Sequence, residues 1–252
     1  MRQTMRLVRA AKSGNETRHY MRDIKEALAQ NADIDGCDPE EPTTYLQGFS
    51  ALHFAALNGD AELARFLLRR RADVNRLCAA KGETPLHQAA GVGSTEVVSI
   101  LLDHGAFVDS ASKWHWTPLH WATRHDHAAC VKLLLDKAAN ASLSAKPWRG
   151  ESMRLLKHFP GLNFNPMEFA VMRRSDASLA IFRERKLLPD HLSAYKEGGE
   201  EPRRRLSAKV EGNKLVLEIA EEEEEEGPEE EREREEKEEE REEEEEGREE
   251  ED

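Results

Sequence analysis

The sequence predicts an all-α protein, built as a stack of about five helix-turn-helix repeats. The first observation is a motif that recurs at a fixed period: Ser50-Ala-Leu-His53, Thr84-Pro-Leu-His87 and Thr117-Pro-Leu-His120. Its histidines are 34 and then 33 residues apart. The second observation is an apolar echo behind each motif, which ends at Leu68, Leu102 and Leu135. A period of this length is typical of a stacked repeat array rather than of one globular core.

Each repeat predicts two helices followed by an extended loop, which we call a finger. Thr84 stands before Pro85 and is free to cap a first helix, because proline at the first helical position costs no hydrogen bond. Gly93 provides a left-handed stop, and Ser94, like Asp60 one repeat earlier, is expected to cap the second helix. Apolar residues at helical spacing mark that second helix: Val97, Val98, Leu101 and Leu102.

At these residues the sequence resembles the ankyrin-repeat family. The resemblance rests on Thr-Pro-Leu-His-x-Ala at 84–89 and 117–122, on the weaker form at 50–55, and on Ala-Asp-Val-Asn at 72–75. It implies an ankyrin-repeat solenoid whose first helices and fingers line a concave face. The chain departs from the family pattern after two second helices, where Arg71 and Ala138 replace the expected glycine. These departures concern local turn geometry and not the fold.

The repeat register predicts the domain organisation. An ankyrin-repeat domain spans 1–194, with repeats at about 4–35, 48–80, 81–113 and 114–145, an insertion at 146–162 and a degenerate repeat at 163–194. Residues 195–220 form a linker in which alternating polarity predicts a short strand or a hairpin. Residues 221–252 form a Glu-rich tail that we expect to be disordered, since it cannot bury apolar surface.

Charge divides the chain into two parts. The 252 residues carry a net charge of −14, but residues 221–252 alone hold 24 acids and 5 bases, a net charge of −19, which leaves +5 for the rest. Three cysteines, Cys37, Cys78 and Cys130, have neither metal-site nor disulfide-framework spacing. The basic N-terminus is similar to a transit peptide, but its pattern joins the repeats, so we expect a capping helix. With no secretory segment or membrane span in the sequence, we expect an intracellular protein, cytoplasmic or nuclear.

No residue pattern predicts catalysis, a metal or a cofactor. His53, His87 and His120 share one repeat position, where the resemblance implies a structural hydrogen bond. His125 and His127 lie in a turn, and their spacing is not a specific metal signature. The sequence has no Gly-rich phosphate loop and no nucleophile elbow. We therefore expect a protein that is not an enzyme.

The fourth repeat predicts a protein-binding surface. Trp114, Trp116, Trp121, Arg124 and His125 fall in its finger or on its first helix, and Trp and Arg dominate interface energetics. Phe54 and Gln88 occupy positions matching Trp121 in the preceding repeats. The alternative is that Trp116 and Trp121 pack against the next repeat or the insertion. The arginines between Arg65 and Arg71 are read as a solvated outer face, and we expect neither nucleic acid nor membrane as a partner.

Two short motifs lie near the tail. Arg204-Arg-Leu-Ser207 resembles a basophilic kinase site, which makes Ser207 a candidate for phosphorylation. Leu215, Val216, Leu217 and Ile219, followed by acids, resemble a SUMO-interacting strand, although an ordinary strand before a charged tail is the competing interpretation.

Two hypotheses of function follow from these observations. The first is a scaffold or interaction module that binds a protein partner through the concave face. The second is an acidic-tail protein that binds or shields basic partners such as histones.

Overall fold

The computed structural model describes residues 1–14, 19–38, 46–146, 164–188, 206–211 and 214–219. Within this part of the chain, helices follow one another as antiparallel pairs. The pairs are α1 (Arg2–Ser13) with α2 (Tyr20–Ala29), α3 (Ala51–Leu57) with α4 (Ala61–Arg69), α5 (Pro85–Val92) with α6 (Thr95–Asp103), α7 (Pro118–Arg124) with α8 (Ala128–Asp136), and α10 (Pro166–Arg173) with α11 (Asp176–Glu184).

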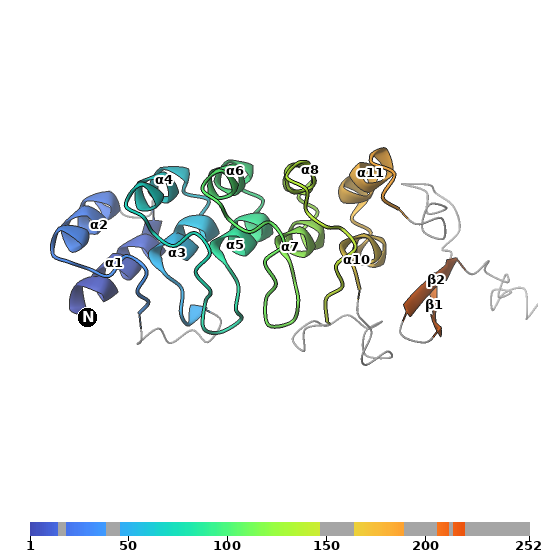
Figure 1. Ribbon diagram of the computed structural model, residues 1–252, viewed down its shortest axis with the longest axis horizontal. Helices are drawn as coiled ribbons and strands as arrows, with labels where there is room; N and C mark the ends of the chain where they lie inside the picture. The colour runs from blue at the N-terminus through green and yellow to red at the C-terminus, as the bar shows by residue number, and fades with distance from the viewer. Residues whose placement is uncertain (15–18, 39–45, 147–163, 189–205, 212–213, 220–252) are drawn as a thin grey trace, which may run out of the picture. The chain divides into compact units, whose positions relative to one another are not determined.

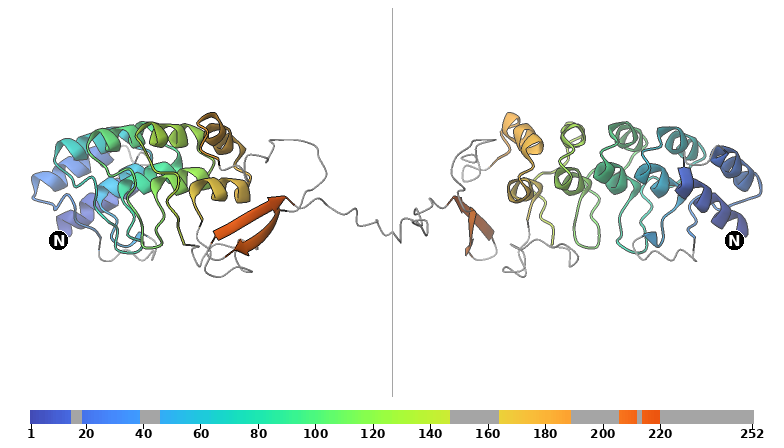
Figure 2. Two further views of the ribbon diagram at one scale, coloured as in Figure 1. Left: turned by 45° about the vertical axis from the view of Figure 1, so that its right-hand side comes forward. Right: turned by 180° about the vertical axis from the view of Figure 1, so that it is seen from behind.

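The helix pairs stack side by side in two rows. The first helices α1, α3, α5, α7 and α10 each pack on the next, and the second helices α4, α6, α8 and α11 form a parallel row. Figure 1 shows the second helices above the first, with the fingers below. The right-hand view of Figure 2 shows the same two rows from behind. This arrangement confirms the predicted stack of two-helix repeats.

Three capping histidines start the first helices and join neighbouring repeats. In α5 the Thr84 backbone N–H donates to His87 Nδ1 at 3.0 Å, and the ring Nε2 contacts the Trp116 carbonyl of the next repeat at 2.9 Å. His53 and His120 repeat both contacts, reaching the carbonyls of Glu83 and Phe164. Because a carbonyl only accepts, Nε2 carries the proton and Nδ1 is the acceptor. The structural role predicted for these histidines is confirmed.

The second helices are capped less uniformly than the sequence predicts. Asp60 caps α4 as expected, accepting a hydrogen bond from the Leu63 backbone N–H at 2.9 Å. Ser94 stands at the same place before α6 but makes no side-chain capping bond, so that prediction is wrong. Its hydroxyl instead lies beside Gly59 of the preceding repeat, which has no side chain to fill the space.

The turns after the second helices keep one backbone conformation whatever residue occupies them. Gly105 has a φ of 86°, and Arg71 and Ala138 have φ values of 65° and 62° at the equivalent positions. All three lie in the left-handed region, where a side chain costs about 1–2 kcal/mol. The two departures from the family pattern therefore leave the turn geometry unchanged.

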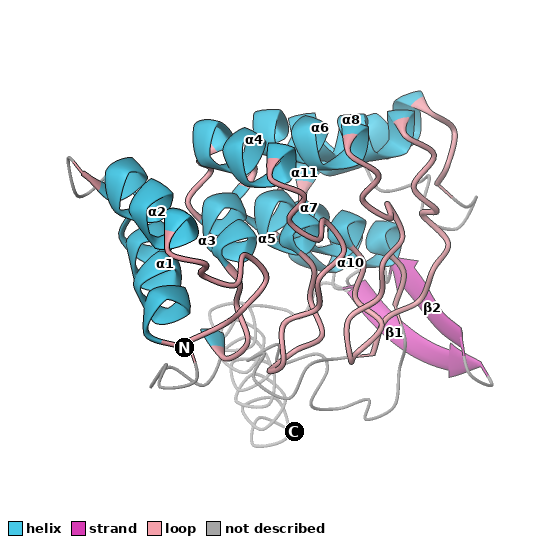
Figure 3. Ribbon diagram, turned by 60° about the vertical axis from the view of Figure 1, so that its left-hand side comes forward, coloured by secondary structure: helices cyan, strands magenta, loops and turns pink. Residues whose placement is uncertain are grey.

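The fingers pair with one another near their tips. Lys113 N donates to the Lys81 carbonyl at 2.9 Å, and Lys146 N donates to the Trp114 carbonyl at 2.9 Å. The same link joins the first two of these fingers, from Ala80 N to Gln47 O at 3.1 Å. Figure 3 shows the fingers as pink loops that run together below the first helices. These bonds hold side chains of successive fingers in register.

The helix pair α10–α11 also begins with a capping box, but different residues form it. Before α10, Asn165 and Glu168 form a reciprocal capping box, in which Asn165 N donates to Glu168 Oε2 at 2.8 Å. Further along, β1 (Leu206–Glu211) and β2 (Lys214–Ile219) form a two-stranded sheet. The predicted insertion from 147, the linker before 206 and the Glu-rich tail lie outside the described residues.

Candidate functional site

Trp116 lies in the core at the base of the fourth finger. Its side chain is 2% exposed, and it packs with Ala145, Phe164 and Phe169. Its indole Nε1 donates to the Lys146 carbonyl at 2.9 Å. Ala145 and Phe164 pair as an isolated antiparallel bridge at the two ends of the insertion. Of the two interpretations of Trp116 drawn from the sequence, its position matches packing, here against Phe164 and Phe169 of the next repeat.

Phe54 is also buried, with an exposed fraction of 1%. Its ring meets that of Phe49 at a centroid distance of 5.4 Å with edge-to-face geometry. The rings of Phe54 and Trp116 are therefore not presented on the surface. The predicted residues that remain available for a binding surface are Trp114, Trp121, Arg124, His125 and Gln88.

Trp121 and Arg124 form the centre of that remaining surface, and both are partly exposed. The Arg124 guanidinium lies 5.2 Å from the Trp121 ring and 5.6 Å from the Trp116 ring. Lys81 Nζ lies 5.6 Å from the Trp121 ring. Distances below about 6 Å are those of cation–π attraction. Two of the chain's own cations thus lie beside the Trp121 ring and favour this orientation of it.

Glu83 is a residue that sequence reasoning missed. Its side chain is buried beside this cluster, with a residue exposure of 2%, and it accepts a hydrogen bond from Gln88 Nε2 at 2.8 Å. Burial raises the pKa of the Glu83 carboxyl, while the charges of Lys81 and Arg124 and the hydrogen bond from Gln88 oppose that rise. A small pocket is lined by Lys81, Glu83, Trp114, Trp116, Trp121 and Arg124.

A comparison of repeats in the sequence would have found Glu83. The residue just before each first-helix cap is Phe49, Glu83, Trp116 and Phe164, and all four are buried. Three repeats fill this position with an aromatic ring, and only the repeat at 81–113 places a carboxylate there. The acid therefore stands where the fold itself is satisfied by an apolar side chain.

The remaining predicted residues surround this centre. Trp114 is partly buried against the Trp116 cluster, and Gln88 is partly exposed at its bond to Glu83. His125 is exposed and its ring stacks on Trp121 at a centroid distance of 6.0 Å. The pKa of His125 is lowered, first by partial burial and then by the charges of Arg124, His127 and Arg173. The structure thus brings Trp114, Gln88, Trp121, Arg124 and His125 together.

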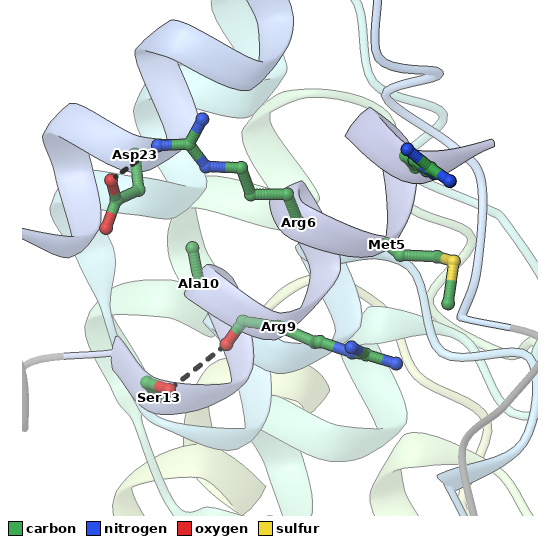
Figure 4. Close-up of a pocket in the computed structure, with 7 residues that line it drawn as sticks. Met5, Arg6, Arg9, Ala10, Ser13 and Asp23 are labelled. Carbon is green, nitrogen blue, oxygen red and sulfur yellow. Dashed lines mark hydrogen bonds and ion pairs between the residues drawn. The ribbon is translucent and has the colours of Figure 1, made fainter.

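Other hollows of the described surface have different chemistry. A groove of about 480 Å³ at the first repeat is lined by α1 and α2 residues, among them Arg6, Arg9 and Asp23. Figure 4 shows Arg6 extending toward Asp23, to which it is paired at 3.1 Å. Arg9 pairs with the buried Asp38 at 2.8 Å. These contacts tie α1 to the rest of its repeat.

The described residues contain no group of three or more His, Cys, Asp or Glu side chains that could hold a metal ion. None of the helices in the described ranges combines the length and the apolar character that crossing a bilayer requires. Ser207 lies in β1, and the predicted SUMO-interacting residues Leu215, Val216, Leu217 and Ile219 lie in β2. The tail proposed to bind basic partners is outside the described residues.

Known proteins share the repeat stretch. A family model for ankyrin repeats in three copies matches residues 52–146. A probable E3 ubiquitin-protein ligase, XBOS31 of Oryza sativa subsp. japonica, is 42% identical over 99 residues, which is 39% of this chain and 22% of that protein. A putative ankyrin repeat protein of Rickettsia bellii is 32% identical over 126 residues, 48% of this chain and 34% of that protein.

A rabbit (Oryctolagus cuniculus) protein named for ankyrin repeats, a SAM domain and a basic leucine zipper is 36% identical over 127 residues, 47% of this chain and 24% of that protein. The chain thus spans between 22% and 34% of the length of these three relatives. The named activities belong to those proteins, and the shared part is the repeat array. Ankyrin repeats are in general protein-interaction modules. The repeated signatures, the stacked helix pairs and the family match together place the stretch from 52 to 146 in the ankyrin-repeat family.

Proposed function

We propose that this chain is a non-enzymatic interaction module that binds a protein partner through the face formed by its fingers and first helices. The centre of that face is the cluster of Trp114, Trp121 and Arg124, with Gln88 and His125 beside it. Aromatic and arginine side chains that are partly exposed and held in fixed orientations are the groups that contribute most at protein interfaces. The fixed orientation lowers the entropy lost on binding.

The observation that carries the proposal is Glu83. A buried carboxylate costs stability relative to an apolar residue of similar volume, and the neighbouring repeats show that the position accepts an aromatic ring. Glu83 contacts Gln88 and acts on Arg124, both of which belong to the proposed face. Titratable groups in such surroundings cluster at functional sites. The carboxylate is therefore explained by the orientation it gives to the groups around it.

The test compares four versions of the full chain: wild type, Trp121→Ala, Glu83→Phe and Phe107→Ala. Phe107 is an exposed aromatic in the turn after α6, with an exposed fraction of 67%, so its truncation removes a surface ring outside the cluster. Each chain is immobilised and the proteins it captures are identified. The affinity of the protein that wild type captures in the largest amount, called the main partner below, is then measured by calorimetry. Thermal unfolding of each variant is recorded alongside.

We expect Trp121→Ala to lower the affinity for the main partner about thirtyfold, the effect of losing about 2 kcal/mol at an interface centre. Glu83→Phe should weaken binding while keeping the unfolding midpoint at or above that of wild type. Phe107→Ala should leave binding unchanged. Wild-type affinity in both cluster variants would refute the proposal.

The alternative function, binding of basic partners by the acidic tail, is separated by one further variant. Deleting residues 221–252 should leave a partner of the concave face bound. Loss of the partner from this deletion, together with full binding by Trp121→Ala, would assign the interaction to the tail instead.

A further inference from the structure

The row of second helices carries a regular set of ion pairs between repeats. Asp103, the last residue of α6, pairs with Lys137 just beyond α8 at 2.9 Å. Asp136, the last residue of α8, pairs in the same way with Arg185 just beyond α11. At each of these two junctions an acid at the end of one helix meets a base one position past the end of the next.

The junction between α4 and α6 breaks this rule. Its equivalent residues are Arg69, the last of α4, and His104, just beyond α6, so two basic groups meet where the other junctions pair an acid with a base. Both line a groove of about 380 Å³ between the two helices. The acids that line the same groove are engaged in other ion pairs, Glu96 with Arg65 at 2.9 Å and Asp103 with Lys137. In the described part of the chain Arg69 forms no ion pair.

Two more arginines enlarge the positive charge at this place. Arg70 and Arg71 follow Arg69 directly, and all three side chains are exposed. Arg70 lies 5.1 Å from the ring of Phe66, which also has Lys25 Nζ at 5.8 Å. The negative end of a helix favours a cation, as Lys137 and Arg185 illustrate after α8 and α11. That effect accounts for one base and not for three arginines in succession beside a histidine.

We infer that Arg69, Arg70, Arg71 and His104, which we call the α4 basic surface, bind an acidic segment of a partner protein. A carboxylate of that segment takes the place that aspartate holds at the other junctions. Arginine suits this role because its guanidinium pairs with a carboxylate through two parallel hydrogen bonds. The surface belongs to the row of second helices, so it is independent of the face proposed above.

The probe is a fluorescently labelled peptide of consecutive glutamates, titrated with the full chain and followed by anisotropy. The chain's own Glu-rich residues 221–252 are kept unchanged in every variant. The test variant is Arg69→Glu/Arg70→Glu. The matched control is Arg174→Glu/Lys186→Glu, which makes the same change of net charge at two exposed bases near the other end of the array.

We expect wild type and the control to bind the peptide, and the test variant to bind about tenfold or more weakly, with wild-type affinity falling as salt is raised. Equal weakening by the control would show that only net charge matters and would overturn the assignment. Failure of the wild-type chain to bind the peptide would overturn it as well.

A second variant guards against misfolding. Arg69→Asp/His104→Lys installs the acid and base found at the next junction, so its unfolding midpoint should match or exceed that of wild type. Its affinity for the peptide should fall, because the new aspartate occupies the position of the partner carboxylate. Peptide binding at wild-type affinity by this variant would contradict the inference.

Discussion

Single residues in this chain depart from what the fold requires, and the departures differ in meaning. Ala138 occupies a left-handed turn that Gly105 fills one repeat earlier, with the same backbone conformation and an added side chain. The Ala138 side chain is exposed. Glu83, by contrast, replaces a buried aromatic and interacts with groups of the proposed face. An exposed residue in a strained turn shows that the fold tolerates the strain. A buried carboxylate that lowers stability and contacts the proposed face is better explained by a role at that face.

Ala138→Gly should stabilise the chain by about 0.5 to 1 kcal/mol, because relief of the left-handed conformation exceeds the extra backbone entropy of glycine in the unfolded chain. The free energy of unfolding measured in urea checks this. Gly105→Ala is the reciprocal control and should destabilise by a similar amount, since no other atom lies within 4 Å of the methyl group it would add. A loss of stability in Ala138→Gly would contradict the strain argument.

The buried histidines predict how stability depends on pH. Burial lowers the pKa values of His53, His87 and His120 to about 4, well below their ordinary value near 6.5. The folded state therefore keeps them neutral while the unfolded chain takes up protons. Their stabilising effect is complete above about pH 6.5 and is lost as pH falls from there toward about 4, by roughly 1 kcal/mol per pH unit for each ring.

Denaturation in urea at a series of pH values between 7.5 and 4.5 tests this. The free energy of unfolding should fall with pH over that range, and His87→Gln should remove about a third of the slope that the three buried rings contribute. A curve that stays flat from pH 7 to pH 5 would show that the rings are not held neutral.

At the scale of helices, caps decide how firmly each element begins, and the sequence predicts them unevenly. The first-helix caps are predicted well, because threonine and histidine stand at fixed positions on either side of proline and bond to each other locally. The second-helix caps are predicted less well. Asp60 and Ser94 are both good capping residues at equivalent positions, but Ser94 lies against Gly59 of another repeat. Its partner depends on stacking and not on neighbours along the chain.

Asp60→Ala and Ser94→Ala form a matched pair that tests this difference. Removing the Asp60 cap should cost about 1 kcal/mol or more of unfolding free energy, because the Leu63 backbone N–H loses its acceptor. Ser94→Ala should cost less than about 0.5 kcal/mol, because no capping bond is lost. Comparable losses in the two variants would mean that Ser94 caps α6 after all.

The candidate site was predictable in part for a similar reason. Trp121 and Arg124 lie on one short helix and His125 directly follows it, so their proximity follows from the sequence. The burial of Trp116 does not, because Phe164 and Phe169 reach it across an insertion whose path no local pattern specifies. Glu83 was visible only by aligning the residues before the caps, a position that carries no part of the repeat signature.

At the scale of the whole array, stability comes from interfaces between neighbouring repeats, because each repeat contacts only the next. Leu101 in α6 and Leu134 in α8 are fully buried at such interfaces. Replacing either by alanine should cost about 2–5 kcal/mol, through lost burial and the cavity left behind. Unchanged denaturation midpoints for both variants would remove the repeat register on which the fold rests.

The link from each capping histidine to the following repeat ends on a main-chain carbonyl, and this has a consequence for how the array can change. Any amino acid supplies that carbonyl, as Glu83, Trp116 and Phe164 show. The hydrogen bond between repeats therefore does not depend on the side chain of the residue whose carbonyl accepts it. New chemistry can be introduced at that buried position without rebuilding the connection, and whole units could be duplicated or exchanged across it. The surface above this position can therefore change through substitutions at the buried residue, while the hydrogen bonds between repeats stay the same.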